Sequence, residues 1–454
     1  MSDLVSRLRG IARGPGRTSG AGPSGAPGGP ERPAPQQPAP REPTYEPERP
    51  SGQPVDPGRV ADALGGEPLG EGRAAFVRVR RRYEPDRRHG EVRISACGCD
   101  RVDLIRLLDP SVDTCAAPLL FFDLETTGLS GGAGTLAFLV GCAWFEDGAL
   151  QLEQYLLTSY AAERALLAHF AERVAACGML VSYNGRTFDA PLLEMRWQFH
   201  RSRAPIGGTP HADMLHPARR LWRTRACDPD GGCSLATLER FLFGVERVND
   251  VPGFEIPSRY FRFLRSGDPA PLEPILEHNR MDLVSLAAVT ARGLALVDGG
   301  SAECRDGWER LALGRLLERH GDAARAMECF GDATNDPSRD VRVEALARIA
   351  ARHRRARRHA EAADAWQQVF ALAHEEQHGN PRTQLLARDA AEALAVHHEH
   401  RARNLAAARE LARKALALER SRRGVESLQY RLQRLERKMG VQQKSGDDAA
   451  PLLD

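Results

Sequence analysis

Two carboxylates stand close together at the end of an apolar run, in the sequence Phe121-Phe122-Asp123-Leu124-Glu125. Aromatic and branched apolar residues of this kind favour a buried strand. Because successive strand side chains point to opposite faces, Asp123 and Glu125 point to the same face, about 6.6 Å apart along the strand. Two like charges this close are costly unless a proton or a cation lies between them. The pair therefore predicts a site for a divalent cation with oxygen ligands.

A second polar cluster follows a later predicted strand, in the run from Ser182 to Asp189. Within it, Asn184-Gly185 is typical of a turn. Asp189 falls at the start of a predicted helix, so its carboxylate could cap backbone N–H groups or bind a metal ion. Asn184 could fix the turn or hydrogen-bond a substrate. Asp213, at the end of a short predicted strand, could approach the same metal or be an ordinary strand-end residue.

The third cluster is Glu277-His278-Asn279-Arg280-Met281-Asp282, which we expect to open an apolar helix. His278 and Asp282 are one turn apart and therefore share a helix face. A histidine in this place suits a general base beside a metal ligand. The alternative is a solvated helix surface.

Alternating strands and helices must bring these clusters together. Hydrophobic periodicity predicts strands over residues 119–124, 136–145, 150–157, 179–183 and 211–215, and helices over 162–176, 190–200, 235–243 and 277–297. This order is typical of an α/β fold with a mixed sheet flanked by helices.

The three clusters resemble the exonuclease motifs of the DEDD superfamily, as Asp-x-Glu, Asn-x-x-x-Phe-Asp and His-x-x-x-Asp in chain order. Together with the run Ser130 to Thr135, they are more closely similar to the YprB-type ribonuclease H-like domain. The resemblance covers about residues 118–298. It implies a ribonuclease H-like fold and two-metal 3′–5′ exonuclease chemistry.

The resemblance also implies roles for particular residues. The implied metal ligands, which also count as catalytic residues, are Asp123, Glu125, Asp189 and Asp282. The implied base is His278, and the predicted substrate-binding residues are Thr126, Gly128, Asn184 and Arg186. One departure affects the base. The histidine variant of the superfamily places its histidine five positions before the last aspartate, whereas His278 stands four before Asp282, as the tyrosine variant does. One position turns a helical side chain by about 100°, so His278 would either take a proton from water or orient the water.

The flanking segments differ in composition. Residues 1–57 are rich in Pro and Gly and should be a disordered tail. Residues 58–117 contain short β-like runs and form a predicted β-rich extension. Residues 304–440 are rich in Ala, Leu and Arg with helical spacing, and residues 441–454 should be a second disordered tail.

The helical segment contains a weak internal repeat. Gly314 followed by Ala326 and Phe330 matches a tetratricopeptide-type helix pair, and Ala362 with Trp366 and Ala407 with Leu411 repeat the small-then-large pattern. Such a region is predicted to bind a protein partner or to guide a substrate.

Bulk composition gives weaker guidance. The chain has 454 residues and a formal net charge of +2, so charge alone does not identify a nucleic-acid partner. The sequence lacks a secretory signal pattern and an apolar run of about 18 residues, so we expect a cytoplasmic protein without a membrane span.

We therefore predict a metal-dependent nuclease that acts as a 3′–5′ exonuclease on DNA or RNA ends with two Mg²⁺ or Mn²⁺ ions. One alternative is a non-catalytic nucleic-acid-binding or scaffold protein that keeps the fold. The other is an endonuclease with the same metal site.

Overall fold

The computed structural model describes residues 55–128, 134–226, 232–374 and 380–447. Most of the two predicted disordered tails lies outside these ranges. Helix α2 (Pro57–Leu64) begins where the first tail was expected to end. Helix α16 (Arg422–Asp447) continues through residues 441–447, which were predicted to be disordered. The segment Val441 to Ser445 contains neither Gly nor Pro, so nothing in it interrupts a helix that is already formed.

The described residues include a seven-stranded sheet with the order β1-β2-β7-β6-β5-β8-β9. Its strands are β1 (Glu67–Leu69), β2 (Phe76–Tyr83), β5 (Leu119–Thr126), β6 (Ala137–Glu146), β7 (Ala149–Leu156), β8 (Met179–Ser182) and β9 (His211–Asp213). Strand β5 pairs antiparallel with β6 and parallel with β8, and β8 pairs parallel with β9. The predicted mixed sheet is thus confirmed. The β-rich extension supplies β1 and β2, which continue the same sheet, and a small pair formed by β3 (Arg88–His89) and β4 (Val92–Arg93).

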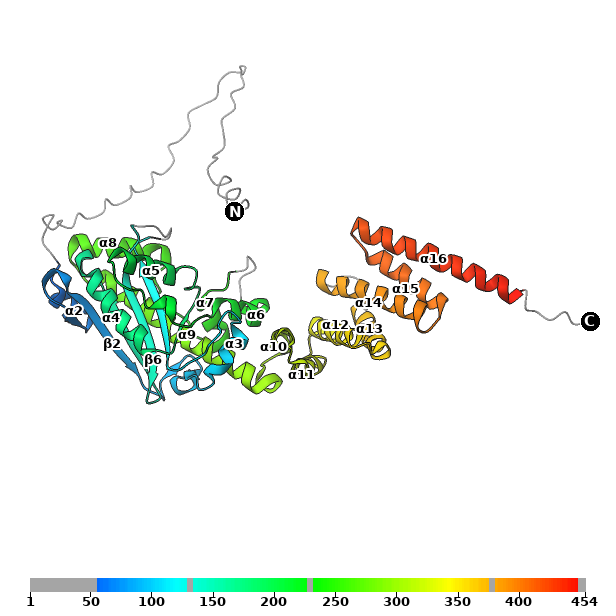
Figure 1. Ribbon diagram of the computed structural model, residues 1–454, viewed down its shortest axis with the longest axis horizontal. Coiled ribbons are helices and arrows are strands. Elements are labelled where there is room, and N and C mark those ends of the chain that lie inside the picture. The colour runs from blue at the N-terminus through cyan, green and yellow to red at the C-terminus, as the bar shows by residue number, and fades with distance from the viewer. Residues whose placement is uncertain (1–54, 129–133, 227–231, 375–379, 448–454) are drawn as a thin grey trace, which may run out of the picture. The chain divides into compact units, whose positions relative to one another are not determined.

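Helices cover both faces of this sheet (Figure 1). Beyond α2, they are α3 (Ile105–Leu108), α4 (Glu163–Ala176), α5 (Asp189–Phe199), α6 (Leu215–Ala226), α7 (Leu235–Phe243), α8 (Ile256–Ser266) and α9 (Glu273–Gly299). Leu120 and Phe122 of β5 share a core with α4, α5 and α8. Leu119 and Phe121 share a second core with α6, α7 and α9. By alternation, Asp123 and Glu125 lie on the α9 face.

Besides α2 and α3, two helices of the sheet domain were not predicted, α6 and α8. Helix α6 starts at Leu215, so the strand expected over residues 211–215 is shorter, and α8 follows a loop. Both helices carry several Arg residues, which lower the mean hydropathy. Few large apolar residues of these helices are fully buried, namely Trp222 in α6, and Tyr260 and Phe263 in α8. An apolar stripe this narrow is weak in a sequence window.

Helix α9 starts at Glu273, about one turn before the predicted start at residue 277. Pro274 fits the first turn, where its missing N–H group costs nothing. His278 and Asp282 therefore lie inside the helix. The segment Ala270–Glu303 is long and apolar enough to cross a membrane by length and composition, but 78% of its most apolar window is buried inside the protein. It is a core helix here.

The region after α9 is helical, as predicted. Its helices are α10 (Gly307–Arg319), α11 (Ala323–Ala333), α12 (Arg339–Arg355), α13 (His359–His374), α14 (Pro381–His400), α15 (Leu405–Leu418) and α16. A Cβ on Gly314 would lie 2.5 Å from a ring carbon of Phe330, so glycine lets α10 and α11 pack closely. In α15 the buried residues are Ala408, Ala412 and Ala415. The predicted pair, Ala407 with Leu411, is only half-buried. The tetratricopeptide type stays a prediction.

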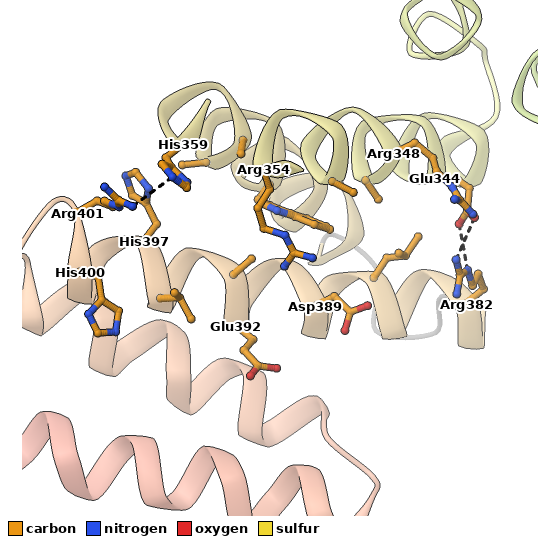
Figure 2. A pocket seen from close by; sticks show the side chains of 18 residues that line it. Glu344, Arg348, Arg354, His359, Arg382, Asp389, Glu392, His397, His400 and Arg401 are labelled. Atoms are coloured by element: carbon orange, nitrogen blue, oxygen red, sulfur yellow. Dashed lines mark hydrogen bonds and ion pairs between the residues drawn. The ribbon is translucent and has the colours of Figure 1, made fainter. Parts of the chain in front are cut away.

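Helices α12, α13 and α14 enclose a groove of about 850 Å³ (Figure 2). Small apolar residues and Trp366 line it, and charged residues surround it. At one end Arg382 donates two hydrogen bonds of 3.1 Å to Glu344. At the other, Arg401 contacts His359 at 3.2 Å. The predicted protein partner of this region stays a prediction.

The helical region and the sheet domain share one core. Val297 of α9 packs in the same cluster as Leu313 of α10 and Phe330 of α11. Buried Glu309 of α10 accepts hydrogen bonds from Trp222 (2.8 Å) and Arg292 (2.7 Å) of the sheet domain. Side chains on the two sides of the predicted boundary between residues 298 and 304 therefore pack against each other.

Candidate active site

The two carboxylates of β5 lie in a largely buried environment. Burial raises the pKa of Asp123 well above its ordinary value, and the charges of Asp282 and Asp189 raise it further. Burial also raises the pKa of Glu125, with added repulsion from Asp123, Asp282 and Asp189. Side chains from β5, α5 and α9 therefore lie within electrostatic reach of one another, as the sequence predicted.

Asn279 holds Asp123 in place. Its Nδ2 donates to Asp123 Oδ2 at 2.9 Å, and its Oδ1 accepts from Gln154 Nε2 at 2.8 Å. The space for Asn279 comes from Gly141, which pairs with Asp123 across β5 and β6. A Cβ on Gly141 would lie 2.1 Å from Asn279 Oδ1. Strand β6 therefore needs glycine at this position.

Asp189 is the first residue of α5, and Phe188 occupies the N-cap position. The capping role considered for Asp189 is thus not what the structure shows. Its Oδ2 faces Gly185, where a Cβ would lie only 2.8 Å away. Burial raises the pKa of Asp189 to about 7, and the charge of Asp213 adds to the shift. The ionised form of the Asp189 carboxyl is therefore disfavoured in the folded protein.

Asp213 organises the turn beneath Asp189. Its carboxylate accepts hydrogen bonds from the backbone N–H groups of Asn184 (2.7 Å), Arg186 (3.2 Å) and Leu215 (3.0 Å). Asn184 has a φ of 65°, which asparagine tolerates well. Both residues thus have a turn-forming role in the structure.

The four predicted substrate-binding residues have local partners. Arg186 donates to the hydroxyl of Ser111 and to the backbone carbonyl of His211, and lies 3.5 Å from Asp109. Its guanidinium is engaged within the protein. The Thr126 hydroxyl donates to the Gly128 carbonyl at 2.9 Å. Residues 129–133 of the Gly-rich loop lie outside the described residues.

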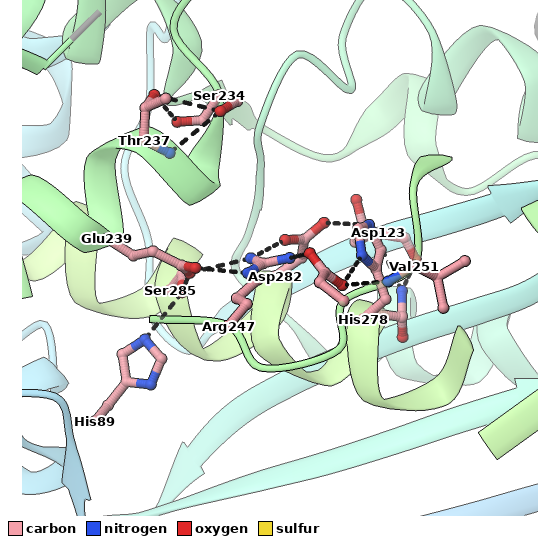
Figure 3. A network of polar contacts seen from close by, with 12 residues as sticks. His89, Asp123, Ser234, Thr237, Glu239, Arg247, Val251, His278, Asp282 and Ser285 are labelled. Atoms are coloured by element: carbon pink, nitrogen blue, oxygen red, sulfur yellow. Dashed lines mark hydrogen bonds and ion pairs between the residues drawn. The ribbon is translucent and has the colours of Figure 1, made fainter. Parts of the chain in front are cut away.

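Helix α9 presents His278 and Asp282 to a segment that the sequence did not single out (Figure 3). Arg247 Nη2 donates to Asp282 Oδ1 at 2.5 Å. Asp250 Oδ1 lies 2.7 Å from His278 Nδ1, and His278 Nε2 lies 3.6 Å from Asp282 Oδ2. The hydrogen bond from His278 and the charge of Arg247 lower the pKa of Asp250 in spite of its burial.

No three His, Cys, Asp or Glu side chains among the described residues converge closely enough to hold a metal ion. The donor set nevertheless fits Mg²⁺ or Mn²⁺ in chemistry, because the predicted ligands are all carboxylates. The raised pKa values of Asp123, Glu125 and Asp189 report repulsion that a cation would relieve.

Sequence reasoning missed Asn279, Arg247 and Asp250. A glycine inside the apolar strand β6 was a signal for Asn279, since strand glycines often mark a close approach of another group. Arg247 and Asp250 lie in an irregular loop, where periodicity gives no signal.

Residues 120–292 match a family model described as the RNase_H superfamily. The uncharacterized protein YprB of Bacillus subtilis (strain 168) is 35% identical over 211 residues, which cover 46% of this chain and 50% of YprB. The chain thus aligns with about half the length of this curated relative. A structure of the family B DNA polymerase from the hyperthermophilic archaeon Pyrobaculum calidifontis is similar with 15% identity and a TM-score of 0.32, over 46% of this chain and 30% of the polymerase chain.

The strand order around β5 and the family match agree with each other. The β7-β6-β5-β8-β9 part of the sheet carries the βββαβα order predicted from the sequence. Residues 120–292, which match the RNase_H superfamily model, contain this part of the sheet, and the chain is similar in sequence to YprB.

Proposed function

We propose that this protein hydrolyses phosphodiester bonds of nucleic acids with divalent cations and shortens strands from the 3′ end. One observation carries the proposal: carboxylates from β5, α5 and α9 lie within electrostatic reach of one another, and the charge of each raises the pKa of Asp123 or Glu125. A protein gains nothing in stability from buried like charges. A binding site for cations accounts for their presence.

Asp123, Glu125, Asp189 and Asp282 would hold the cations. Bound Mg²⁺ or Mn²⁺ would supply Lewis-acid stabilisation of charge on the phosphate. Asn279 would keep Asp123 in its orientation through the bond to Oδ2. His278 would accept the proton of the attacking water at Nε2, since its Nδ1 faces Asp250.

Phe188 supports a nucleic-acid substrate. Its side chain directly precedes Asp189 and is 59% exposed, so its ring is open to a ligand beside the carboxylates. Exposed rings beside a phosphate-cleaving site can stack on nucleobases. Phe188 would then hold the terminal base while the carboxylate site acts on the adjoining phosphate.

The test is a degradation assay with 5′-labelled single-stranded DNA and RNA, in Mg²⁺ or Mn²⁺ and in EDTA. We expect a ladder of products that shorten from the 3′ end, and no products in EDTA. Asp123→Asn should lower the rate by at least about 100-fold, beyond the 10–100-fold typical of residues that only support metal ligands. Asp86→Asn, which changes an exposed carboxylate on a loop, is the matched control.

Two outcomes would contradict the proposal. Cleavage of closed circular DNA with no preference for ends would identify an endonuclease. Tight binding of DNA or RNA with no hydrolysis in any of the cations would identify a non-catalytic binding protein.

A further inference from the structure

The segment between α7 and α8, residues 244–255, adds two charged side chains to the candidate site. Arg247 is the more buried of the two, with a side chain 8% exposed, and Asp250 is 30% exposed. They lie 3.3 Å apart. Neither belongs to the three clusters that carry the resemblance to known nucleases. Their contacts reach both His278 and Asp282, so the segment bears directly on the proposed chemistry.

Asp250 determines which way the His278 ring faces. A carboxylate can only accept, so the 2.7 Å contact requires His278 Nδ1 to carry a proton and to donate it to Asp250 Oδ1. In the neutral ring, Nε2 is then left with its lone pair. That atom faces Asp282 Oδ2 at 3.6 Å, which is too long for a direct hydrogen bond. Asp250 thus fixes the tautomer in which Nε2 can accept a proton.

Arg247 joins three carboxylates through its fork of donors. Its Nε and Nη2 donate to Glu239 at 2.5 and 3.0 Å. Its Nη1 donates to Asp250, and Nη2 also donates to Asp282 Oδ1. Asp282 Oδ2 stays on the His278 side. Lysine could not make these contacts together, because its ammonium is a single point of donation.

A buried chain of hydrogen bonds through Glu239, Ser285 and His89, called the anchor below, holds Arg247 on the side away from Asp282. Glu239 is 1% exposed and also accepts a hydrogen bond from the Ser285 hydroxyl. Because Ser285 donates its proton to Glu239, its oxygen accepts from His89 Nε2 at 2.9 Å. His89 belongs to β3 of the β-rich extension and is itself buried. The anchor therefore spans the extension, α7 and α9.

A purely structural ion pair would account for less of this arrangement. Glu239 alone would satisfy the charge of Arg247, and its two hydrogen bonds are the bidentate kind that holds buried guanidinium groups. The remaining donors point instead to two further carboxylates, Asp250 of the loop and Asp282 of α9. The charge of Asp250 also reaches Glu125, on the other side of the site.

We infer that Asp250 and Arg247 are positioning residues of the hydrolytic site: Asp250 holds His278 with Nε2 free to accept a proton, and Arg247 aligns Asp250 and Asp282. The inference rests on the proposed function and deepens it. It also gives His278 a defined orientation in spite of its four-residue spacing from Asp282.

The first test measures the tautomer of His278 in the full chain, by two-bond ¹H–¹⁵N correlation spectra of histidine-labelled protein at pH 8. His278→Gln identifies its signals. We expect the Nδ1–H form in the wild type and a shift to the Nε2–H form in Asp250→Ala. Asp250→Asn retains an acceptor oxygen and should keep much of the Nδ1–H form. An unchanged tautomer in Asp250→Ala would overturn the role of Asp250.

The second test measures Mn²⁺ binding by titration calorimetry, with Arg247→Lys against Arg259→Lys as the matched control. Arg259 pairs with Glu255 at 3.0 Å outside the network. We expect Arg247→Lys to weaken Mn²⁺ binding by 10–100-fold, as expected for residues that orient metal ligands. Binding that is unchanged or tighter in Arg247→Lys would overturn its role. If Arg247→Lys does not fold, the double variant Glu239→Gln/Arg247→Met, which removes the ion pair with little change in volume, takes its place.

The kinetic readout separates this inference from the proposed function. With an active wild type, Asp250→Ala should lower kcat by 10–100-fold and leave KM within about twofold, with partial rescue in Asp250→Asn. A rise in KM with kcat unchanged would overturn the positioning role. If the wild type does not hydrolyse nucleic acid, the proposed function fails, while the tautomer and Mn²⁺ measurements still decide the placement of His278 and Asp282.

Discussion

The raised pKa of Asp189 makes a quantitative prediction about stability. The pKa rises from the ordinary 3.8 to about 7 because the carboxyl is buried and faces Asp213. The folded state therefore holds this proton more tightly than the unfolded chain does. The contribution to stability is fully present below pH 3.8 and is lost as the pH rises through about 7. The difference between the unfolded pKa of 3.8 and the folded pKa of about 7 corresponds to a total loss of about 4 kcal/mol.

About half of that loss, about 2 kcal/mol, falls between pH 5.5 and pH 8 according to the same linkage relation. Asp189→Asn carries no titrating group and should lose less stability over this interval by about that amount. The assay is urea unfolding in EDTA at several pH values, with Asp86→Asn as a control that should follow the wild type. Parallel stability curves for the wild type and Asp189→Asn would refute the reasoning, because they would show that Asp189 does not titrate differently in the folded state.

Two further variants test the packing on which the site depends. Gly141→Ala places a methyl group 2.1 Å from Asn279 Oδ1 and should lower the free energy of unfolding, measured in urea, by about 1–3 kcal/mol. The control Gly331→Ala lies in open space on α11 and should instead stabilise the protein by up to about 1 kcal/mol. An unchanged free energy of unfolding in Gly141→Ala would show that Asn279 has room to move. Glu399→Ala removes the buried acceptor of Arg431, Arg434 and Lys438 and should increase hydrogen exchange in α16, by loss of about 1–3 kcal/mol of local stability. Unchanged exchange in α16 would show that these ion pairs do not hold the helix.

The sequence predicted the parts of the fold that follow a regular period. The predicted strands 136–145 and 150–157 form the hairpin of β6 and β7, which turns at Asp147-Gly148, where both residues have positive φ. Helix α7 has the predicted bounds of residues 235 to 243. In α6 and α8, arginines interrupt narrow apolar stripes, so composition concealed helices that tertiary packing stabilises.

The same distinction between regular and irregular segments applies to the candidate site. Asp123, Glu125, Asp189 and Asp282 lie at the ends of regular elements or on their faces, where alternation and helical spacing predict direction. Arg247 and Asp250 lie where the chain has no period, and only the folded structure brings them to α9. Arg186 was predicted to bind substrate, but its partners in the protein, Ser111 and the carbonyl of His211, come from tertiary contacts that the sequence does not show.

Helix α9 has a further consequence for how the chain can be divided. It is 27 residues long, about 40 Å at 1.5 Å per residue, and it carries His278 near one end and Val297 near the other. Val297 packs with Leu313 and Phe330, which belong to the helical region. A chain cut after residue 298 would keep all four carboxylates but would expose the apolar end of the helix that carries Asp282. Each large side chain uncovered in this way costs about 1.5–3 kcal/mol, so we expect the sheet domain to need α10 and α11 for its full stability.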